Sequence, residues 1–346
     1  MIDDARLDRV RAQIEAPLLV TAPVDVLYLT GLHSSNAALL VEADRARLFT
    51  DFRYLDKARE LGLEVVEVPR NIYSGLAGHV SGPIEFQAET LTYAAWAALG
   101  ESGLELVPRH ELLVRIRAVK EDAELEAISR AAAITNECFA RLAQEPFVGR
   151  TERELAWWFD SLAHELGADR MAFPTIVASG PAGAQPHAST GDRVIEAGTT
   201  VVVDAAAKLG DYCSDCTRTF ATGELPGELA RSYEICLRAQ EAALATLRPD
   251  VRGADVDAVA RDLISAEGLG DLFGHGLGHG LGLEVHELPR LRPESDDLLP
   301  GGGVCTVEPG IYHAGLGGIR IEDLVIVDGH GPQVLTTFTK ELVTVS

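Results

Sequence analysis

The chain has 346 residues, of which 47% are hydrophobic and 24% are charged, and its formal net charge is −23. A chain of this length and composition can bury one large core or two unequal ones, which excludes extensive disorder. The acidic balance argues against nucleic acid as a partner, because phosphate binding needs basic surface, although acidic clusters can attract divalent cations.

The five cysteines are an odd number and predict no disulfide framework. Residues 1–20 contain several charges in place of the apolar core of a signal peptide. No stretch approaches the roughly 18 to 20 uninterrupted apolar residues that a membrane helix needs. We therefore expect a protein of the reducing cytoplasm without a membrane partner.

The first part of the chain alternates predicted strands with predicted helices. Short apolar runs predict strands at 17–21, 37–42, 47–50, 65–68 and 84–86, and a last segment ends near residue 107. Helical patterns lie at 52–61 and 93–99. This alternation predicts a small α/β domain, which we place at residues 1–117.

The second part, residues 118–346, is predicted to form a larger domain. Amphipathic patterns predict helices at 121–142, 152–166, 233–247 and 256–267. The second of these helices has a capping signal, Thr151 followed three residues later by Glu154. Strands between and after the helices carry the chemically informative residues, and no internal repeat indicates a solenoid.

A hairpin is predicted over residues 199–220, with its turn at Gly210. In that register Asp204 faces Thr217, and Asp215 lies on the same sheet face one diagonal step away, at a backbone separation of roughly 7–8 Å. Either aspartate alone is more often a simple turn residue. Asp204 ends an apolar run, however, where a buried unpaired charge would be costly, so the pair indicates a metal site.

A second hairpin is predicted around Gly315. This turn places Glu308 opposite Glu322, and Arg320 points to the same face because side chains alternate along a strand. The alternative is a surface pair of glutamates with an arginine for charge balance.

A glycine-rich segment at 273–287 lies between the two hairpins. Alternating glycines disfavour a helix and let the backbone approach a neighbour closely. They also leave His275 and His279 on one side if the segment is extended. A single histidine is more often structural, but three histidines here, with His286, favour a functional segment.

The candidate metal ligands are Asp204, Asp215, His279, Glu308 and Glu322. Four carboxylates in one site would repel one another and raise their pKa values unless cations lay between them. Oxygen donors with one imidazole suit Mn²⁺, Co²⁺, Fe²⁺ or Zn²⁺ better than copper. Cys213 and Cys216 have the spacing of a redox motif, but they flank a ligand candidate in a presumed strand, so we expect buried structural cysteines.

At these residues the chain resembles the metallopeptidase family with the pita-bread fold, which includes aminopeptidase P, prolidase and methionine aminopeptidase. The matching motifs are Ser-Asp-Cys-Thr-Arg-Thr at 214–219, Gly-His-Gly-Leu-Gly with His-Glu at 278–287, Glu-Pro-Gly at 308–310 and Arg-Ile-Glu-Asp at 320–323. Residues 26–31 and 50–54 resemble the extra N-terminal domain of the aminopeptidase P and prolidase branch. The implied fold is α/β (α+β), with a small N-terminal α/β domain followed by a catalytic pita-bread domain.

The resemblance also implies how the ligands are shared between two divalent ions in each subunit. Asp204 would bind one ion through both oxygens, and Asp215 and Glu322 would bridge the pair. His279 and Glu308 would complete the other ion. We expect Mn²⁺, with Co²⁺ or Zn²⁺ as alternatives.

Further roles follow from the same resemblance. His187 and His286 would hold the substrate and stabilise the tetrahedral intermediate, Arg320 would orient Glu322, and His275 matches another family position. Glu308 would also carry a proton to the departing proline nitrogen.

The expected activity is that of an aminopeptidase P-like Xaa-Pro peptidase, in which a hydroxide bridging the two ions cleaves the bond before proline. One alternative is a strict Xaa-Pro dipeptidase, which would need an extra positive group for the free carboxylate of the product. The other is an inactive binding or scaffold protein that keeps the ligands. Short proline-containing peptides are the expected partners, and a homodimer is implied by analogy alone.

Overall fold

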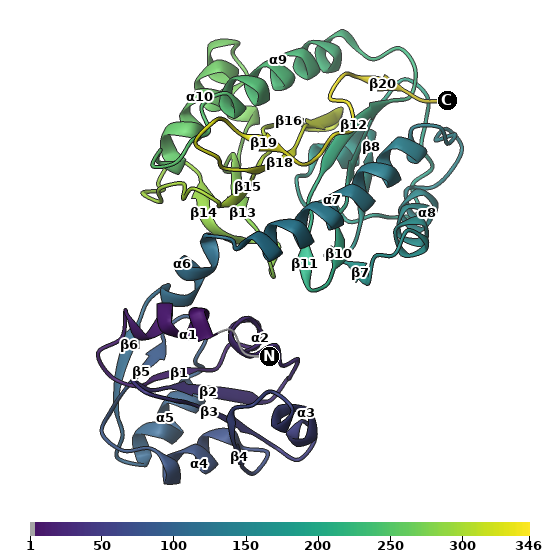
Figure 1. Ribbon diagram of the computed structural model, residues 1–346. Helices are drawn as coiled ribbons and strands as arrows, with labels where there is room; N and C mark the ends of the chain where they lie inside the picture. Colours follow the sequence, from purple (N-terminus) through teal and green to yellow (C-terminus); the bar gives the residue numbers. More distant parts are fainter. Residues whose placement is uncertain (1–3) are drawn as a thin grey trace. The chain divides into compact units, whose positions relative to one another are not determined.

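The computed structural model describes residues 4–346, and the chain divides into two compact units between Ile116 and Arg117 (Figure 1). Helix α6 (Leu112–Ala118) contains this boundary. In residues 4–346 no helix is both long enough and apolar enough to cross a membrane.

The first unit contains a six-stranded sheet in the order β4-β3-β2-β1-β5-β6. Its strands are β1 (Leu18–Val20), β2 (Ala37–Val41), β3 (Ala46–Thr50), β4 (Glu64–Glu67), β5 (Pro83–Gln87) and β6 (Glu105–Arg109). The helices are α1 (Asp4–Arg11), α2 (Pro23–Thr30), α3 (Leu55–Arg59), α4 (Ile72–Leu76) and α5 (Tyr93–Glu101). The predicted strands are confirmed, whereas α1, α2 and α4 were not expected.

Helix α3 is shorter than the helix predicted at 52–61. Asp51 forms a local turn in its place, because its Oδ1 accepts a hydrogen bond from the backbone N of Arg53 at 3.0 Å. The backbone N of Tyr54 donates to the carbonyl of Asp51 at 3.1 Å. An aspartate that bonds its own downstream backbone competes with helix formation, so the helix begins only at Leu55.

The second unit begins with α7 (Asp122–Leu142) and α8 (Glu152–Glu165), which agree with the predicted helices, and α8 has the predicted capping box. They share a core with a four-stranded sheet in the order β20-β12-β9-β8. Its strands are β8 (Ile176–Ser179), β9 (Thr200–Asp204), β12 (Thr217–Ala221) and β20 (Val343–Thr344). Phe139 contacts Phe159 and Phe220 at the centre of this core, with ring centroids 5.2 and 6.5 Å apart.

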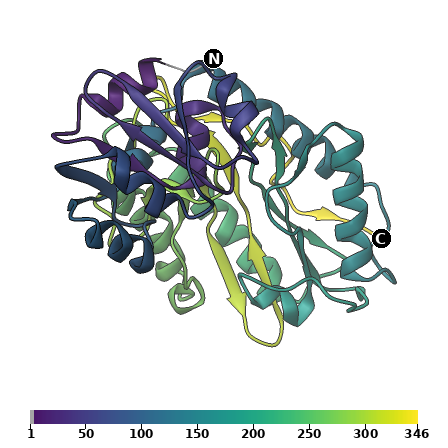
Figure 2. The same ribbon diagram turned by 90° about the horizontal axis from the view of Figure 1, so that it is seen from below.

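The rest of this unit pairs α9 (Gly227–Leu244) and α10 (Gly253–Ala266) with a five-stranded sheet in the order β14-β13-β15-β18-β19. The strands are β13 (Gly278–Gly280), β14 (Glu287–Leu291), β15 (Val304–Val307), β18 (Asp323–Ile326) and β19 (Gln333–Val334). A separate hairpin, β16 (Gly310–His313) with β17 (Gly317–Arg320), reaches the lower edge of Figure 2 in yellow-green. Helix α9 begins before the predicted start at 233, directly after Pro226, which is its N-cap residue.

Candidate metal centre

The first predicted hairpin has the expected register, since Asp204 lies opposite Thr217 in the β9–β12 pairing. Its tip is formed by β10 (Ala207–Leu209) and β11 (Tyr212–Cys213), with positive φ values of 54° at Gly210 and 71° at Asp211. Asp215 lies in the break between β11 and β12 and is only 3% exposed. Asp215 is therefore buried in a segment that is not paired as a strand, between β11 and β12.

The second predicted hairpin is also confirmed. Val307 pairs with Asp323, and Gly310 pairs with Arg320. Glu308 and Glu322 therefore occupy matching positions in the interval between these two pairs. Each hairpin thus supplies two carboxylates next to a point where the regular pairing of its two strands is interrupted.

The glycine-rich segment forms the short strand β13, which lies between β14 and β15. A Cβ atom at Gly278 would clash with the carbonyl oxygen of Thr306, and one at Gly280 would clash with that of Leu288. Only glycine allows this close approach, which confirms the interpretation of the alternating glycines. His279 is held between them, while His275 precedes the strand.

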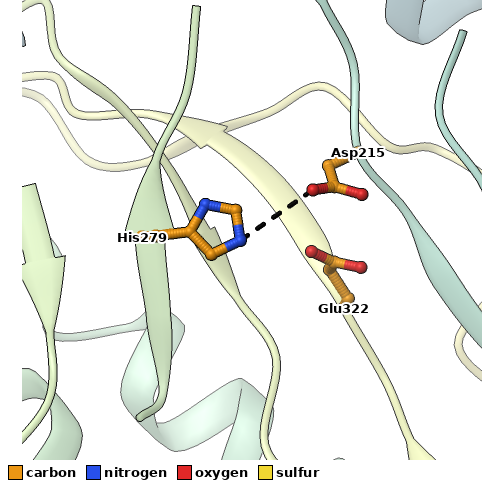
Figure 3. Close-up of side chains that lie close together, drawn as sticks. All are labelled: Asp215, His279 and Glu322. Atoms are coloured by element: carbon orange, nitrogen blue, oxygen red, sulfur yellow. Dashed lines mark ion pairs between the residues drawn. The ribbon is translucent and has the colours of Figure 1, made fainter. Parts of the chain in front are cut away.

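Asp215, His279 and Glu322 point toward one another from three separate segments (Figure 3). Each offers one ligand atom, and these atoms all lie within 4.8 Å of one another. His279 Nε2 lies 3.9 Å from Asp215 Oδ2 and 3.2 Å from Glu308 Oε1. An oxygen-rich set with one imidazole at this spacing could hold a divalent cation.

Asp204 adds a further oxygen to this set. Its Oδ2 accepts a hydrogen bond from Arg320 Nη2 at 2.7 Å. Its Oδ1 is buried and has no hydrogen-bond partner within residues 4–346. A buried carboxylate oxygen without a partner is costly, so this atom fits a site built for a cation.

Three of the carboxyl groups disfavour each other's ionisation. Burial raises the pKa of Asp215 well above its ordinary value, and the negative charges of Glu322 and Asp204 raise it further. The pKa of Glu322 is raised in the same way by burial and by the charges of Glu308 and Asp204. Burial also raises the pKa of Asp204. Divalent cations between these groups would remove the repulsion, so the donor set fits the expected pair of ions.

Glu308 and His279 behave as a coupled pair. Burial alone would raise the pKa of Glu308, but the hydrogen bond and charge of His279 outweigh it and lower the pKa to about 2. Burial alone would lower the pKa of His279, and the contact with Glu308 raises it. Glu308 is thus the carboxylate of the set that is most easily ionised.

Two threonines hold the glutamates, and sequence reasoning assigned neither a role. Thr217 Oγ1 donates to Glu322 Oε2 at 2.7 Å and accepts from Arg320 Nε at 3.1 Å. Thr306 Oγ1 donates to Glu308 Oε1 at 3.0 Å. The available signal was strand alternation, because Thr306 lies two residues before Glu308.

The remaining predicted histidines lie around this centre. His275 Nε2 is 2.9 Å from the hydroxyl of Tyr312, which also accepts from Arg320 Nη1 at 3.1 Å. The ring of His286 lies edge-on to that of His279, with centroids 4.3 Å apart. Burial lowers the pKa of both His275 and His286, which favours neutral imidazoles. Tyr312 was missed, although it follows Glu308 by four residues on an alternating strand.

His187 is exposed and lies at the edge of this group. The carbonyl of the preceding residue, Pro186, accepts from Arg320 Nη1 at 3.2 Å. The charge of His187 contributes to lowering the pKa of His275 and of His286, so all three imidazoles lie close to one another. The structure therefore brings the predicted ligands and the predicted substrate-side residues into one region.

Cys213 and Cys216, on either side of Asp215, are buried and free. Burial raises the pKa of Cys213 to about 11 and raises that of Cys216 as well. These thiols agree with the expected structural role.

The chain belongs to metallopeptidase family M24, whose profile matches residues 126–329, while residues 6–119 match the creatinase/prolidase N-terminal domain. This confirms the resemblance and the expected fold, a small α/β domain followed by a pita-bread domain. Members of this family are hydrolases that use a dinuclear divalent metal centre.

Two relatives are similar to this chain over nearly its whole length. A Bacillus subtilis peptidase named YqhT is 36% identical over 94% of this chain and 95% of its own length. The Xaa-Pro dipeptidase of Pyrococcus furiosus is 35% identical over 99% of this chain and 97% of its own length.

Solved structures of related peptidases are similar to this chain over nearly its whole length as well. The Xaa-Pro dipeptidase from Bacillus anthracis has a TM-score of 0.95 and 35% identity and covers 99% of both chains. The X-Pro aminopeptidase from Thermotoga maritima has a TM-score of 0.88 and 34% identity and covers 98% of this chain and 100% of its own.

Proposed function

We propose that this protein is a two-metal Xaa-Pro dipeptidase. The observation that carries the proposal is the convergence of Asp215, His279 and Glu322, with Glu308 and Asp204 beside them, in a chain similar over its full length to Xaa-Pro dipeptidases. The aminopeptidase P-like activity expected from the sequence becomes the second candidate. It is supported by the likeness to the Thermotoga maritima aminopeptidase.

The five ligands would hold two divalent ions, with Mn²⁺ as the expected metal and Co²⁺ or Zn²⁺ as alternatives. Bound there, the ions would activate a water molecule and polarise the scissile carbonyl. Asp215 and Glu322 would be among the ligands of these ions, whose charge would relieve the repulsion that raises the pKa of both carboxyl groups.

The other residues would act on the substrate and on the proton. Glu308, whose lowered pKa keeps it ionised, would relay a proton to the departing proline nitrogen. His187 and His286 would hold the peptide and donate to the developing oxyanion, and His275 lies beside them against the hydroxyl of Tyr312. Arg320 would keep Asp204 in place through their 2.7 Å ion pair.

The test is to strip the protein of metal, restore Mn²⁺, Co²⁺ or Zn²⁺ separately, and follow proline release from an Xaa-Pro dipeptide and N-terminal residue release from the matched Xaa-Pro-Yaa tripeptide. Metal-dependent cleavage of the dipeptide alone is the expected result. Cleavage of the tripeptide would favour the aminopeptidase. Binding of metal without cleavage of either peptide would contradict both and favour the binding role.

The homodimer and the cytoplasmic location expected from the sequence stay predictions. The five free, buried cysteines are compatible with a reducing compartment.

A further inference from the structure

Residues 180–190, the segment that carries His187, begin and end at one buried carboxylate. This carboxylate belongs to Glu152, in the first turn of α8, which is 1% exposed. Its Oε1 accepts hydrogen bonds from the backbone N and from Oγ of Ser179, both at 2.8 Å. Its Oε2 accepts from the backbone N of Gly191 at 3.3 Å. One side chain thus closes the base of the segment.

The start of α8 reinforces this closure. Its first amides have no partners within the helix, and two of them donate to the returning chain. The backbone N of Glu152 donates to the carbonyl of Arg193, and that of Arg153 donates to the carbonyl of Gly191, both at 3.0 Å. The helix dipole also favours a negative charge at this end. A buried carboxylate is therefore stable here, and it accepts from donors on both ends of the segment.

The far side of the segment contacts the second carboxylate hairpin. A Cβ atom at Gly318 would clash with the carbonyl oxygen of Gly183, so the two backbones are in direct contact. Three residues later the carbonyl of Pro186, next to His187, accepts from Arg320. The segment is fixed at its base by Glu152 and near its tip by an arginine of the metal centre.

We infer that Glu152 is a positioning residue for His187. It acts through the 180–190 segment to fix the imidazole beside the metal centre, and it contacts neither metal nor peptide. The inference rests on the proposed Xaa-Pro hydrolysis and on the role of His187 in it.

The decisive variant is Glu152→Gln, which keeps the shape of the side chain. Both oxygens of Glu152 accept hydrogen bonds, so the NH₂ group of glutamine would face a donor and one of these bonds would be lost. A displacement of about 1 Å at a reacting group can lower turnover by up to about a hundred-fold, and we expect roughly a ten-fold loss of kcat/KM on an Xaa-Pro dipeptide, mostly in kcat. Bound metal should be unchanged.

Glu154→Gln is the matched control. This residue lies in the same helical turn, but its carboxylate accepts from Thr151, at 2.7 and 2.9 Å, at the cap of the helix. We expect it to lower thermal stability and to leave turnover unchanged. Should Glu152→Gln fail to fold, Ser179→Ala removes one donor only and should shift kcat in the same direction by less.

A double-mutant cycle with His187→Ala separates positioning from general damage. If Glu152 acts through His187, the loss caused by Glu152→Gln disappears in the His187→Ala background. Equal fold losses in both backgrounds would overturn the inference, and so would full activity of His187→Ala.

Hydrogen–deuterium exchange gives a readout that does not depend on activity. Amides of residues 179–191 should exchange faster in Glu152→Gln than in the wild type, and at the wild-type rate in Glu154→Gln. Unchanged exchange in Glu152→Gln would contradict the inference. Wild-type protein that binds metal but cleaves no Xaa-Pro peptide would overturn the proposed function instead, and the exchange experiment would still decide whether Glu152 fixes the segment.

Discussion

The two halves of the second unit supply the same number of carboxylates by different means. In the first half, built on α7 and α8, the aspartates lie on a diagonal, with Asp204 at a strand end and Asp215 in a strand break. In the second half, built on α9 and α10, Glu308 and Glu322 occupy matching positions of one hairpin. The shorter aspartate side chains of one hairpin and the longer glutamate side chains of the other thus reach the same candidate centre.

In each half, one carboxylate is held by a side chain of the other half. Thr217 of the first half donates to Glu322 of the second. In the opposite direction, Arg320 of the second half donates to Asp204 of the first. The site is therefore assembled only when the two halves have packed together.

Two further ion pairs connect the two halves. Arg218, on β12, is buried and donates to Asp323 Oδ1 at 2.9 Å. Lys120, just before α7, donates to Glu287 Oε2 at 2.9 Å, with both side chains 1% exposed. Each pair can be broken by a separate substitution, so the contribution of each contact between the two halves can be measured.

The largest effect is expected from Asp215→Asn in the first half. The amide cannot bridge two cations as a carboxylate does, so turnover should be lost and the bound metal should fall below two ions per chain. Because the neutral side chain also removes repulsion from Glu322, the thermal midpoint without added metal should rise. Metal analysis, kinetics and thermal melting check this.

Asp211→Asn, at the turn of the same hairpin, is the control for this variant, since asparagine tolerates its positive φ of 71°. It should keep both metal and activity. Wild-type turnover in Asp215→Asn would refute the assignment of Asp215 as a ligand.

Arg218→Met should cause the next largest effect, a loss of stability. Breaking a buried ion pair from one side typically costs about 3–5 kcal/mol. Asp323 keeps its second ion pair with Lys340 at 3.0 Å, so we expect the lower end of this range. The variant also leaves the carbonyl of Phe338 without its 2.8 Å donor. Denaturant unfolding measures the loss, and Arg238→Met, in an exposed pair with Glu267, should cost no more than about 1 kcal/mol.

A smaller effect is expected from Thr217→Val, which keeps the side-chain volume and removes the hydroxyl between the halves. Leaving a buried partner unsatisfied costs about 1–3 kcal/mol. Loss of an outer partner of a metal ligand typically lowers metal affinity by about 10–100-fold. Metal titration tests this against Thr219→Val, whose hydroxyl bonds only to backbone atoms of Arg320. Equal affinities in the two variants would argue against a special role of Thr217.

The smallest effect concerns the pH dependence of Glu287. Burial alone would raise its pKa, but the charges of Lys120 and Arg117 outweigh it and lower the pKa. A depressed carboxyl pKa stabilises the fold above the unfolded value of about 4.3, and this contribution is lost as the pH falls through the folded value. The stability difference between wild type and Glu287→Gln should therefore shrink below about pH 4.3. If the stability difference between the two proteins stays constant with pH, the ionisation of Glu287 does not contribute to stability in this way.

The sequence predicted the parts of the site that depend on local pattern. The registers of both hairpins follow from a turn glycine and the period of two, so Asp204 opposite Thr217 and Glu308 opposite Glu322 could be placed before the structure was known. The set of candidate ligands follows from these hairpins and the glycine-rich segment, whereas the sharing of the ligands between two ions comes from the family resemblance alone.

The rest depends on packing between segments distant in the chain. Tyr312 matters because its hydroxyl contacts both His275 and Arg320. Strand alternation from Glu308 places Tyr312 on the same face, but only the fold shows these two partners. Glu152 is an acidic residue at a predicted helix start, and only the fold shows that it is buried against Ser179. Local pattern sets the register of a hairpin, whereas these contacts depend on how the elements pack around the centre.

The buried thiols next to Asp215 also affect which ions the centre can accept. Cys213 and Cys216 donate to the carbonyls of Leu283 and Glu322, at 3.7 and 3.9 Å, and burial makes both protons harder to remove than in an exposed cysteine. A thiophilic ion such as Cd²⁺ binds thiolate, and here it would have to displace those protons in an apolar environment. We therefore expect these cysteines to stay protonated beside Asp215, and the oxygen-rich donor set to prefer ions that favour oxygen ligands.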